Sequence, residues 1–283
     1  MTVLEGIQKS AEFLAKKGVE SSRLQAELLL AHLLKLPRMK LYLNFERVLT
    51  PAETDGLREL VRRRGQREPL QHILGSTSFC GFEIAVNRHV LIPRPETELL
   101  AEAGSKFLST VNHQPSTTLD FGTGSGCLAI AIALKTPGAQ VHAVDVSGDA
   151  LELAKQNAAS HQLAGRIQFF QGDGFAALPK EICFDLIVSN PPYIPSAEIE
   201  TLEPEVRDFD PRDALDGGPD GLDFYRRLAV EAGAFLKPAG KLMLEFGEGQ
   251  AAALWEIFEK QKWVVEAVLP DYTRRERIFI ARR

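Results

Sequence analysis

The sequence predicts an α/β protein in which a small helical domain precedes a doubly wound domain with a seven-stranded, mostly parallel sheet. Three observations lead to this prediction. From Thr117 onward, apolar runs typical of strands alternate with segments of helical periodicity, as in parallel sheets. A glycine-rich stretch, residues 122–126, lies where the first of these strands turns into the first helix. Residues 1–75, in contrast, show only helical patterns.

The composition is that of an ordinary globular protein. The chain has 283 residues, of which 45% are hydrophobic and 25% are charged, enough for one large and one small domain. Its cysteines, Cys80, Cys127 and Cys183, lack the CxxC spacing, which argues for a reducing compartment and against a disulfide framework or a metal site. The sequence has no apolar stretch of membrane-spanning length and no signal-peptide pattern, so we expect a cytoplasmic protein without a membrane partner.

Charge is unevenly distributed along the chain. Residues 1–75 contain 13 Lys and Arg against 9 Asp and Glu, a net charge of +4, whereas the whole chain has a net charge of −5. The remainder is therefore acidic, at −9, and an acidic surface disfavours tight binding to nucleic-acid phosphates. We expect no direct nucleic-acid partner, and we expect the N-terminal part to be the better candidate for contacting a macromolecule.

The N-terminal domain is predicted to consist of about three helices. Apolar residues recur at helical spacing over residues 4–14. Ser22, followed three residues later by a glutamine, has the form of a capping box and is predicted to open a second helix with apolar residues over 24–36. Residues 50–53, Thr-Pro-Ala-Glu, open a third helix, with Thr at the N-cap and Pro at the first helical position.

Residues 76–95 are predicted to be a β-hairpin linker. Two apolar runs, residues 79–86 and 89–92, flank the polar pair Asn87-Arg88, which is typical of a hairpin turn. The prolines of the next segment, residues 93–98, favour an extended chain that runs into a helix. This segment is either a simple linker or a lid beside a pocket, and its spacing does not distinguish the two.

The large domain is predicted to alternate strands and helices. Its predicted strands are residues 118–121, 140–144, 167–171, 184–189, 241–246, 263–268 and 277–281. Its predicted helices are residues 125–135, 149–161, 223–235 and 250–260. One connection, residues 194–222, is long and rich in Pro, Asp and Gly, and a loop of this length in a compact domain usually has a function.

The glycine-rich loop predicts a nucleoside-containing cofactor. Gly122, Gly124 and Gly126 form a GxGxG pattern at the start of a helix, where free N–H groups and the absence of side chains allow close approach of a ligand. A dinucleotide fingerprint would place its third glycine at position 127, where this chain has Cys127. The spacing therefore favours S-adenosylmethionine over NAD, and no Lys-Ser/Thr follows as a P-loop would require.

Two further strand ends carry groups suited to the same cofactor. The second strand ends in Asp145, nineteen residues after Gly126, where a carboxylate can accept both ribose hydroxyls. The third strand ends at Asp173-Gly174, which can hydrogen-bond an adenine amino group. Because ligands bind outside the carboxyl ends of parallel strands, we expect these groups to face one cofactor.

The fourth strand delivers Asn190-Pro191-Pro192-Tyr193 to the same edge of the sheet. The prolines restrict the backbone, so that the Asn190 side chain is held with little freedom. An amide carbonyl and a proline carbonyl can accept the two hydrogens of a planar –NH2 group, and the Tyr193 ring can stack on it. Next to a methyl sulfonium, this arrangement predicts N-methylation of a planar amine or amide, which can belong to glutamine, adenine, cytosine or guanine.

Several segments together resemble the HemK/PrmC family of peptide chain release factor glutamine N5-methyltransferases. The resemblance covers nearly the whole chain, and the combination of motifs is more specific than any single one. The segments that match are residues 79–82, 90–98, 120–126, 190–194 and 209–218. It implies a Rossmann-like S-adenosylmethionine-dependent methyltransferase domain that methylates the glutamine of the Gly-Gly-Gln motif in class 1 release factors, with S-adenosylhomocysteine as the product.

By position, the resemblance implies a role for each motif residue and for each part of the chain. The cofactor would be held by Gly122, Thr123, Gly124, Ser125, Gly126, Asp145, Asp173, Gly174 and Asn190. The substrate would be held by Asn190, Pro191, Pro192, Tyr193, Arg94 and Glu98, of which Asn190, Pro191 and Tyr193 would act in catalysis. Residues 1–75 would help to hold the release factor, residues 76–95 would be the hairpin linker, and residues 96–283 would form the methyltransferase domain.

Two positions depart from the family pattern. Gly174 stands where the family often has a bulky apolar residue against adenine, and Arg274 stands where a glycine is common. Three alternatives remain open: a glutamine methyltransferase acting on a ribosomal protein, a nucleic-acid amino methyltransferase, and a non-catalytic cofactor- or RNA-binding module. We expect a monomer.

Overall fold

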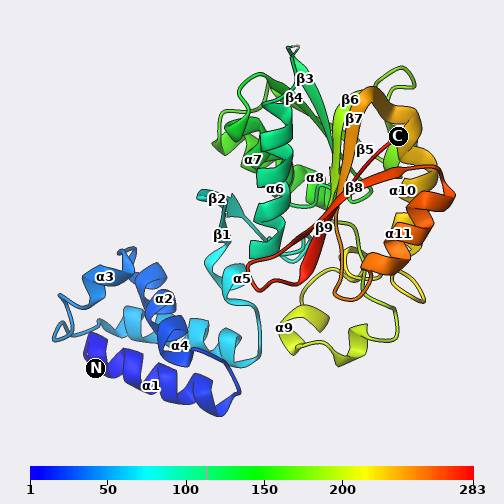
Figure 1. Ribbon diagram of the computed structural model, residues 1–283. Coiled ribbons are helices and arrows are strands. Elements are labelled where there is room, and N and C mark those ends of the chain that lie inside the picture. The colour runs from blue at the N-terminus through cyan, green and yellow to red at the C-terminus, as the bar shows by residue number, and fades with distance from the viewer. Residues whose placement is uncertain (113) are drawn as a thin grey trace. The chain divides into compact units, whose positions relative to one another are not determined.

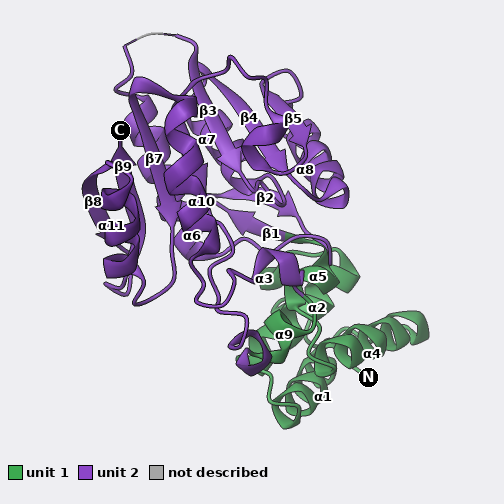
Figure 2. Cartoon of the chain, turned by 90° about the vertical axis from the view of Figure 1, so that its right-hand side faces the viewer, with its two compact units in different colours: residues 1–76, 203–209 green, residues 77–202, 210–283 purple. Residues whose placement is uncertain are grey.

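The computed structural model describes residues 1–112 and 114–283, and this part of the chain divides into two compact units. Unit 1 comprises Met1–Ser76 together with Glu203–Phe209, and unit 2 comprises Thr77–Leu202 together with Asp210–Arg283 (Figure 2). The segment Glu203–Phe209 is flanked on both sides by unit 2 in the sequence. Unit 1 is therefore built from two separate stretches of chain, which the helical patterns of the first 75 residues do not reveal.

Unit 1 is helical, and its helices pack their apolar faces into one cluster. Its helices are α1 (Val3–Lys16), α2 (Ser22–Leu34), α3 (Arg38–Leu41), α4 (Pro51–Gly65), α5 (Leu70–Leu74) and α9 (Pro204–Arg207). Fully buried residues of the cluster include Ile7 and Leu14 of α1, Leu29 and Leu30 of α2, and Leu57 of α4. Within α1, α2 and α4 the buried positions recur at helical spacing, so that each of these three helices presents one apolar face to the others, whereas no residue of α9 is buried.

Side-chain capping explains where α4 begins but not where α2 begins. α4 starts as predicted: Thr50 Oγ1 accepts the Glu53 N–H at 3.2 Å, and the Glu53 carboxylate accepts the Thr50 N–H at 2.9 Å. The capping box predicted at Ser22 is wrong. Ser21 is the N-cap, with a φ of 47° and no side-chain cap, and the Gln25 side chain donates to the Glu20 carbonyl instead.

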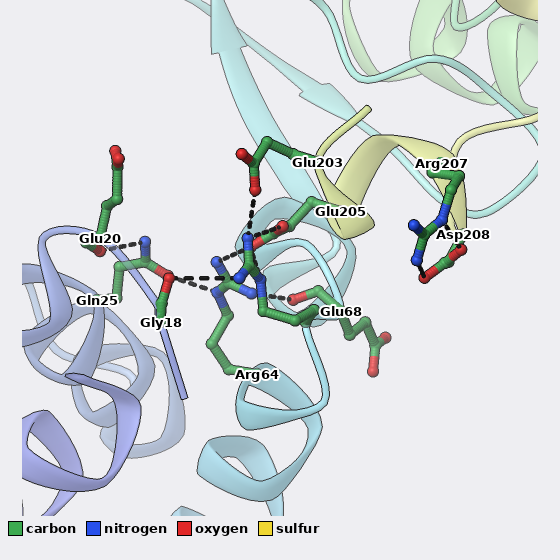
Figure 3. A network of polar contacts seen from close by, with 10 residues as sticks. Gly18, Glu20, Gln25, Arg64, Glu68, Glu203, Glu205, Arg207 and Asp208 are labelled. Atoms are coloured by element: carbon green, nitrogen blue, oxygen red, sulfur yellow. Dashed lines mark hydrogen bonds and ion pairs between the residues drawn. The ribbon is translucent and has the colours of Figure 1, made fainter. Parts of the chain in front are cut away.

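A network of ion pairs holds α9 within unit 1 (Figure 3). Arg64 Nη2 and Arg67 Nε each lie 2.7 Å from Glu205 Oε1, and Arg67 Nη2 lies 2.8 Å from Glu203 Oε2. Burial pushes the pKa of Glu205 upward, but the hydrogen bonds from Arg67 and Arg64 outweigh it and hold the pKa below its ordinary value. The Arg64 side chain is only 5% exposed, so Glu205 neutralises a buried guanidinium.

The predicted hairpin is present, but its turn lies elsewhere. Strands β1 (Ser76–Phe79) and β2 (Phe82–Ala85) are joined by Cys80 and Gly81, with φ values of 51° and 81°. Two consecutive positive φ values form the two-residue turn that matches the twist of antiparallel strands. The prediction of a turn at residues 87–88 and of a second strand over 89–92 is wrong, because the chain reverses within the apolar run.

Unit 2 contains the predicted sheet. Within the described residues, it has seven strands: β3 (Ser116–Phe121), β4 (Ala139–Asp145), β5 (Ile167–Gln171), β6 (Phe184–Ser189), β7 (Leu236–Glu245), β8 (Val264–Pro270) and β9 (Glu276–Arg282). Their order is β5-β4-β3-β6-β7-β9-β8; β9 pairs antiparallel with both β7 and β8, and the other pairs are parallel. The chain order reverses between β3 and β6, where such sheets bind ligands.

Helices cover both faces of this sheet (Figure 1). One face packs against α6 (Pro95–Leu108), α7 (Cys127–Lys135) and α8 (Gly148–Ser160), and the other against α10 (Asp223–Glu231) and α11 (Ala251–Lys260). Side chains alternate along each strand, so that β6 buries Leu186 and Val188 on the first face and Ile187 on the second. This burial on both faces explains the nearly continuous apolar runs in the sequence.

Short 3-10 helices complete unit 2. They are η1 (Gly174–Ala177), η2 (Ile199–Thr201), η3 (Arg212–Ala214) and η4 (Ala232–Phe235), and η4 occupies the last part of the helix predicted over 223–235. Arg274, in the turn between β8 and β9, has a φ of 68°. The chain thus keeps at this position the left-handed conformation that glycine adopts most readily. None of the helices in the described part of the chain is long and apolar enough to cross a membrane.

Candidate active site

A cavity of about 230 Å³ lies at the carboxyl ends of β3, β4, β5 and β6, within unit 2. Its walls include the glycine-rich loop after β3, the ends of β4 and β5, and Asn190 and Pro192 after β6. The segment before α6 and the η3 turn contribute further wall residues. The four strand ends predicted from the sequence to share a ligand therefore do meet at one cavity.

The glycine-rich loop leaves its backbone open to the cavity. Gly122, Gly124 and Gly126 have φ values of 74°, 53° and 80°, which side chains rarely tolerate. A Cβ atom on Gly126 would lie 3.1 Å from Cβ of Ala154, so this glycine allows α7 and α8 to pack. A Cβ atom on Gly122 or Gly124 would meet nothing within 4 Å among the described residues, which leaves room there for a ligand.

Asp120 holds this loop in place through hydrogen bonds from inside the sheet. Its side chain is fully buried, and Oδ2 accepts the Thr123 hydroxyl at 2.6 Å and the Ala129 N–H at 3.1 Å. Burial raises the pKa of Asp120 to about 7, although these two hydrogen bonds oppose the rise. Asp120 thus fixes both the loop and the first turn of α7.

Asp145 has capacity left for a ligand. Its Oδ2 accepts the Gly124 N–H at 2.8 Å, and its Oδ1 accepts the Ser147 N–H at 2.9 Å. Each carboxylate oxygen can accept a second hydrogen bond. Because Asp145 also lines the cavity, its carboxylate can accept further hydrogen bonds from a ligand there.

The Asp173-Gly174 turn packs tightly against its neighbours. Asp173 forms an ion pair with Arg227 of α10, although its side chain is 75% exposed. Gly174 has a φ of 61°, and a Cβ atom there would lie 2.8 Å from the Phe121 ring and 3.0 Å from Arg227 Nη2. The absence of a side chain at Gly174 therefore has a steric reason in this chain, because Arg227 and Phe121 occupy that space.

Asn190 presents an unpaired acceptor at the cavity. Its Nδ2 donates to Thr97 Oγ1 at 3.1 Å, and the Thr97 hydroxyl donates to Glu245 Oε2 at 2.6 Å. Asn190 Oδ1 is buried and has no hydrogen-bond partner within residues 1–112 and 114–283. A buried carbonyl oxygen without a partner is costly, unless a ligand supplies the missing donor.

The backbone of Tyr193 and of the next residue packs against the returning part of the long connection, residues 215–221. Ile194 N donates to the Leu215 carbonyl and Gly217 N donates to the Ile194 carbonyl. A Cβ atom on Gly217 would lie 2.8 Å from Tyr193 Cα, and one on Gly221 would lie 2.3 Å from the Tyr193 carbonyl oxygen. These glycines let the returning chain support the Asn190–Tyr193 segment closely. The neighbouring Pro191 is buried.

The two charged residues predicted near the substrate differ in position. Arg94 lines the cavity and pairs with the buried Asp210 at 2.8 Å. Burial raises the pKa of Asp210 to about 6, against the opposing charge of Arg94. Glu98 is not among the residues that line this cavity, and its carboxylate accepts the Cys80 N–H of the hairpin turn at 2.8 Å.

Four residues of this region were not assigned a role from the sequence: Asp120, Thr97, Arg227 and Glu245. Asp120 could have been found, because it is a charged residue in a buried strand, one residue before Phe121 ends that strand and the glycine-rich stretch begins. Thr97, Arg227 and Glu245 stand in no local pattern with the residues they contact. Only the fold brings α6, α10 and β7 to the ends of β5 and β6.

Comparisons with known proteins agree with this architecture. The family model of the PrmC N-terminal domain matches residues 5–75, and that of the methyltransferase small domain matches residues 100–202. The chain is 47% identical to the release factor glutamine methyltransferase of Geobacter sulfurreducens, covering 92% of this chain and 89% of that protein. It is 42% identical to the release factor glutamine methyltransferase of Chlorobaculum tepidum, covering 98% and 95%.

One solved structure gives the same result for the fold. A methyltransferase from Pyrococcus furiosus has a TM-score of 0.52 against this chain, at 20% identity, covering 72% of this chain and 90% of that one. At this level of identity the similarity concerns the fold.

Proposed function

This chain belongs to the release factor glutamine methyltransferase family, and from that premise we propose that it methylates the side-chain amide nitrogen of a glutamine in a peptide chain release factor. The methyl donor is S-adenosylmethionine, and the enzyme is a protein-(glutamine-N5) methyltransferase. We further propose that the glutamine is that of the Gly-Gly-Gln motif of class 1 release factors.

The observation that supports this function best is the unpaired oxygen of Asn190. A glutamine side chain ends in an –NH2 group, whose hydrogens need acceptors when the group is buried. Asn190 Oδ1 is a buried acceptor on a residue that lines the cavity, and the structure describes no donor for it. The site therefore has an unpaired acceptor oxygen to which the –NH2 group of a substrate amide could donate.

The residues present also fit the cofactor. Gly122 and Gly124 leave backbone exposed without an obstructing atom, and Asp145 retains free acceptor positions. We propose that residues 122–126, Asp145 and the Asp173-Gly174 turn hold S-adenosylmethionine, with Asn190 close to its reactive end. When bound, the cofactor supplies an electrophilic methyl group on a positively charged sulfur.

The protein's task is to make an amide nitrogen reactive. The nitrogen lone pair of an amide is delocalised into the carbonyl, so it is a weak nucleophile. Acceptance of the two N–H groups by Asn190 Oδ1 and the Pro191 carbonyl raises electron density on nitrogen and favours its pyramidal form, mainly in the transition state. Fixing the nitrogen in line with the methyl group supplies a further part of the rate enhancement.

We propose that Tyr193 contributes a packing surface for the substrate amide and does not act as a general base. Burial, together with the nearby Glu245 carboxylate, raises the pKa of Tyr193 to about 12. The phenol is therefore protonated at neutral pH, and we propose that its ring packs on the substrate amide beside Pro192. The amide would exchange one N–H proton for the methyl group, with S-adenosylhomocysteine as the other product, and Tyr193 would not be needed to take that proton, because an N-methylated amide cation is strongly acidic.

The first test is the identity of the acceptor. Labelled S-adenosylmethionine and the protein are incubated in separate reactions with a class 1 release factor, with ribosomal proteins and with DNA. We expect label only in the release factor, and none when the Gly-Gly-Gln glutamine is replaced by alanine. Label in ribosomal protein or DNA alone would contradict the proposed substrate, and transfer to none of them would indicate a binding module.

The second test concerns Asn190. We expect Asn190→Ala to bind S-adenosylmethionine with an affinity within about threefold of wild type, because the glycine-rich loop and Asp145 are intact. Its kcat should fall about 100-fold or more, since one preorganised hydrogen bond to the reacting group is lost. Calorimetry measures the affinity and label transfer measures kcat. Wild-type turnover in this variant would remove Asn190 from the mechanism.

A further inference from the structure

Thr97 and Glu245 form a buried hydrogen-bonded chain that ends at Asn190. Thr97 Oγ1 lies 2.6 Å from Glu245 Oε2 and 3.1 Å from Asn190 Nδ2. Thr97 is 3% exposed and Glu245 is 1% exposed, so water does not compete for these bonds. The two residues come from the first turn of α6 and the last residue of β7, far apart in the sequence.

The direction of these two hydrogen bonds follows from which groups carry a hydrogen to donate. A threonine hydroxyl has a single hydrogen, and the Glu245 side chain, which burial keeps protonated only below about pH 7, has none once it is ionised. The hydroxyl of Thr97 donates to Glu245, which leaves only lone pairs of its oxygen facing Asn190. Asn190 must therefore turn its –NH2 group toward Thr97, and its carbonyl oxygen must face the other way.

The opposite orientation of the Asn190 amide is disfavoured. It would place Asn190 Oδ1 against Thr97 Oγ1, two oxygens with no hydrogen between them. The clash could be relieved only if Thr97 turned its hydroxyl away from Glu245, which would leave a buried carboxyl oxygen without its donor. In either case a buried polar group loses its partner.

We propose that Thr97 and Glu245 are positioning residues that hold Asn190 with its carbonyl oxygen toward the substrate amide. This inference rests on the proposed function, because it specifies how that function's acceptor group is oriented. Neither residue touches the reacting atoms. An asparagine that rotated freely would present its –NH2 group half of the time, and a donor facing the substrate's own –NH2 group is repulsive.

The kinetic test uses Thr97→Val, which keeps the shape of the side chain and removes the hydroxyl. We expect kcat for release factor methylation to fall about 10- to 100-fold, while the Kd for S-adenosylmethionine stays within about twofold. Thr97→Ser should restore kcat to within about threefold, because the hydroxyl returns. An unchanged kcat in Thr97→Val, or no rescue by serine, would overturn the role of Thr97.

A matched control exists at the C-cap of α7. Thr136 is 6% exposed, and its hydroxyl has no partner in the part of the chain that the structure describes. Thr136 does not line the cavity. Thr136→Val makes the same chemical change at a buried site in the same unit, and we expect wild-type kcat. An equal loss in both variants would mean a general structural effect and would overturn the proposal.

Glu245 is tested by Glu245→Gln. The glutamine side chain has nearly the same shape but offers a donor as well as an acceptor, so it no longer dictates the direction of the chain. We expect a drop in kcat of about 3- to 10-fold, smaller than in Thr97→Val, because the amide oxygen can still accept from Thr97. Wild-type kcat in Glu245→Gln would exclude Glu245 from the positioning role.

A double variant separates positioning from general support. If Thr97 acts only through Asn190, then Asn190→Ala with Thr97→Val should be no slower than Asn190→Ala alone. Losses that multiply in the double variant would contradict the proposal.

One readout does not depend on the substrate. In protein labelled with nitrogen-15 asparagine, the Asn190 side-chain signal is identified by its loss in Asn190→Ala. We expect this signal to shift and its hydrogens to exchange faster with solvent in Thr97→Val but not in Thr136→Val. An unchanged signal in Thr97→Val would overturn the positioning role, whereas absence of methyl transfer by wild-type protein would overturn only the proposed function.

Discussion

Asp120 of β3 and Glu245 at the end of β7 are two carboxyl groups that the fold buries in one sheet, on either side of β6. Burial raises the pKa of each to about 7, in spite of the hydroxyl groups of Thr123 and Thr97 that donate to them. The two groups have different tasks: Asp120 shapes the loop after β3, and Glu245 orients the side chain that follows β6 through Thr97. In both cases a short hydrogen bond from a threonine satisfies one carboxyl oxygen.

The raised pKa of Asp120 predicts how stability depends on pH. In the unfolded chain Asp120 ionises near pH 3.8, whereas in the folded protein it ionises near pH 7. Between these values the folded state binds the proton and the unfolded state does not. The contribution of Asp120 to stability is therefore complete below the lower pKa and is lost as pH rises to the higher one, by up to about 1.4 kcal/mol per pH unit.

Asp120→Asn isolates this contribution. We expect the difference in unfolding free energy between variant and wild type to move in favour of the variant as pH rises from about 4 to about 7, and to stay constant above that. Urea unfolding at several pH values measures it. The wild-type curve alone is insufficient, because Glu245 and Asp210 also have raised pKa values. Parallel curves for variant and wild type would contradict the assignment.

At the scale of elements, the starts of α2 and α4 show how far a local signal can be trusted. Both segments offer a hydroxyl followed three residues later by Glu or Gln. At α4 the pattern forms a capping box, and Pro51 at the first helical position fixes the backbone for it. At α2 the Gln25 side chain is taken by other partners, the Glu20 carbonyl and, at 2.6 Å, Arg64 Nε.

This difference predicts unequal effects of two similar substitutions. Thr50→Ala removes a side-chain cap and should lower the free energy of unfolding of unit 1 by about 1 kcal/mol. Ser22→Ala is the matched control and should change it by less than about 0.5 kcal/mol, because no capping hydrogen bond is lost. Hydrogen exchange of backbone amides in unit 1 measures both. Equal losses would contradict the N-cap assignments.

At the scale of the whole molecule, unit 1 depends on a segment that lies far away in the sequence. Arg64 and Arg67 bind Glu205, and Glu203 adds an outer ion pair (Figure 3). The Glu203 side chain is 77% exposed, whereas that of Glu205 is 20% exposed. Because solvent screens exposed ion pairs, Glu205 should contribute most of the stabilisation.

Limited proteolysis tests this difference. The peptide bond after Arg207 is a tryptic site within the segment that Glu205 holds. We expect Glu205→Gln to accelerate cleavage after Arg207 about tenfold, because a buried guanidinium loses its counter-charge and local opening becomes easier. Glu203→Gln is the control and should change the rate less than about twofold. Mass spectrometry of the fragment that ends at Arg207 measures both rates, and equal rates would contradict the prediction.

The alternation of strands and helices in unit 2 can be predicted from the sequence. Runs buried on both sheet faces, such as Phe184–Ser189, are mostly apolar, with Asp185 as the exception here, and end at polar residues, so their limits can be found locally. The same local reasoning placed the glycine-rich loop, Asp145 and Asn190 at one edge of the sheet, because parallel strands end on the same side.

Which side chains from distant parts of the sequence meet depends on the tertiary structure. No period or motif connects Thr97, Asn190 and Glu245, or Arg64 with Glu205, since hydrogen bonds and ion pairs across the fold leave no regular spacing in the chain. The hairpin turn at Cys80-Gly81 was missed for a related reason: its flanking residues are apolar, and the turn is specified by positive φ values rather than by polarity. The sequence therefore predicts the acceptor residue Asn190, whereas the direction in which its amide points depends on partners that only folding brings together.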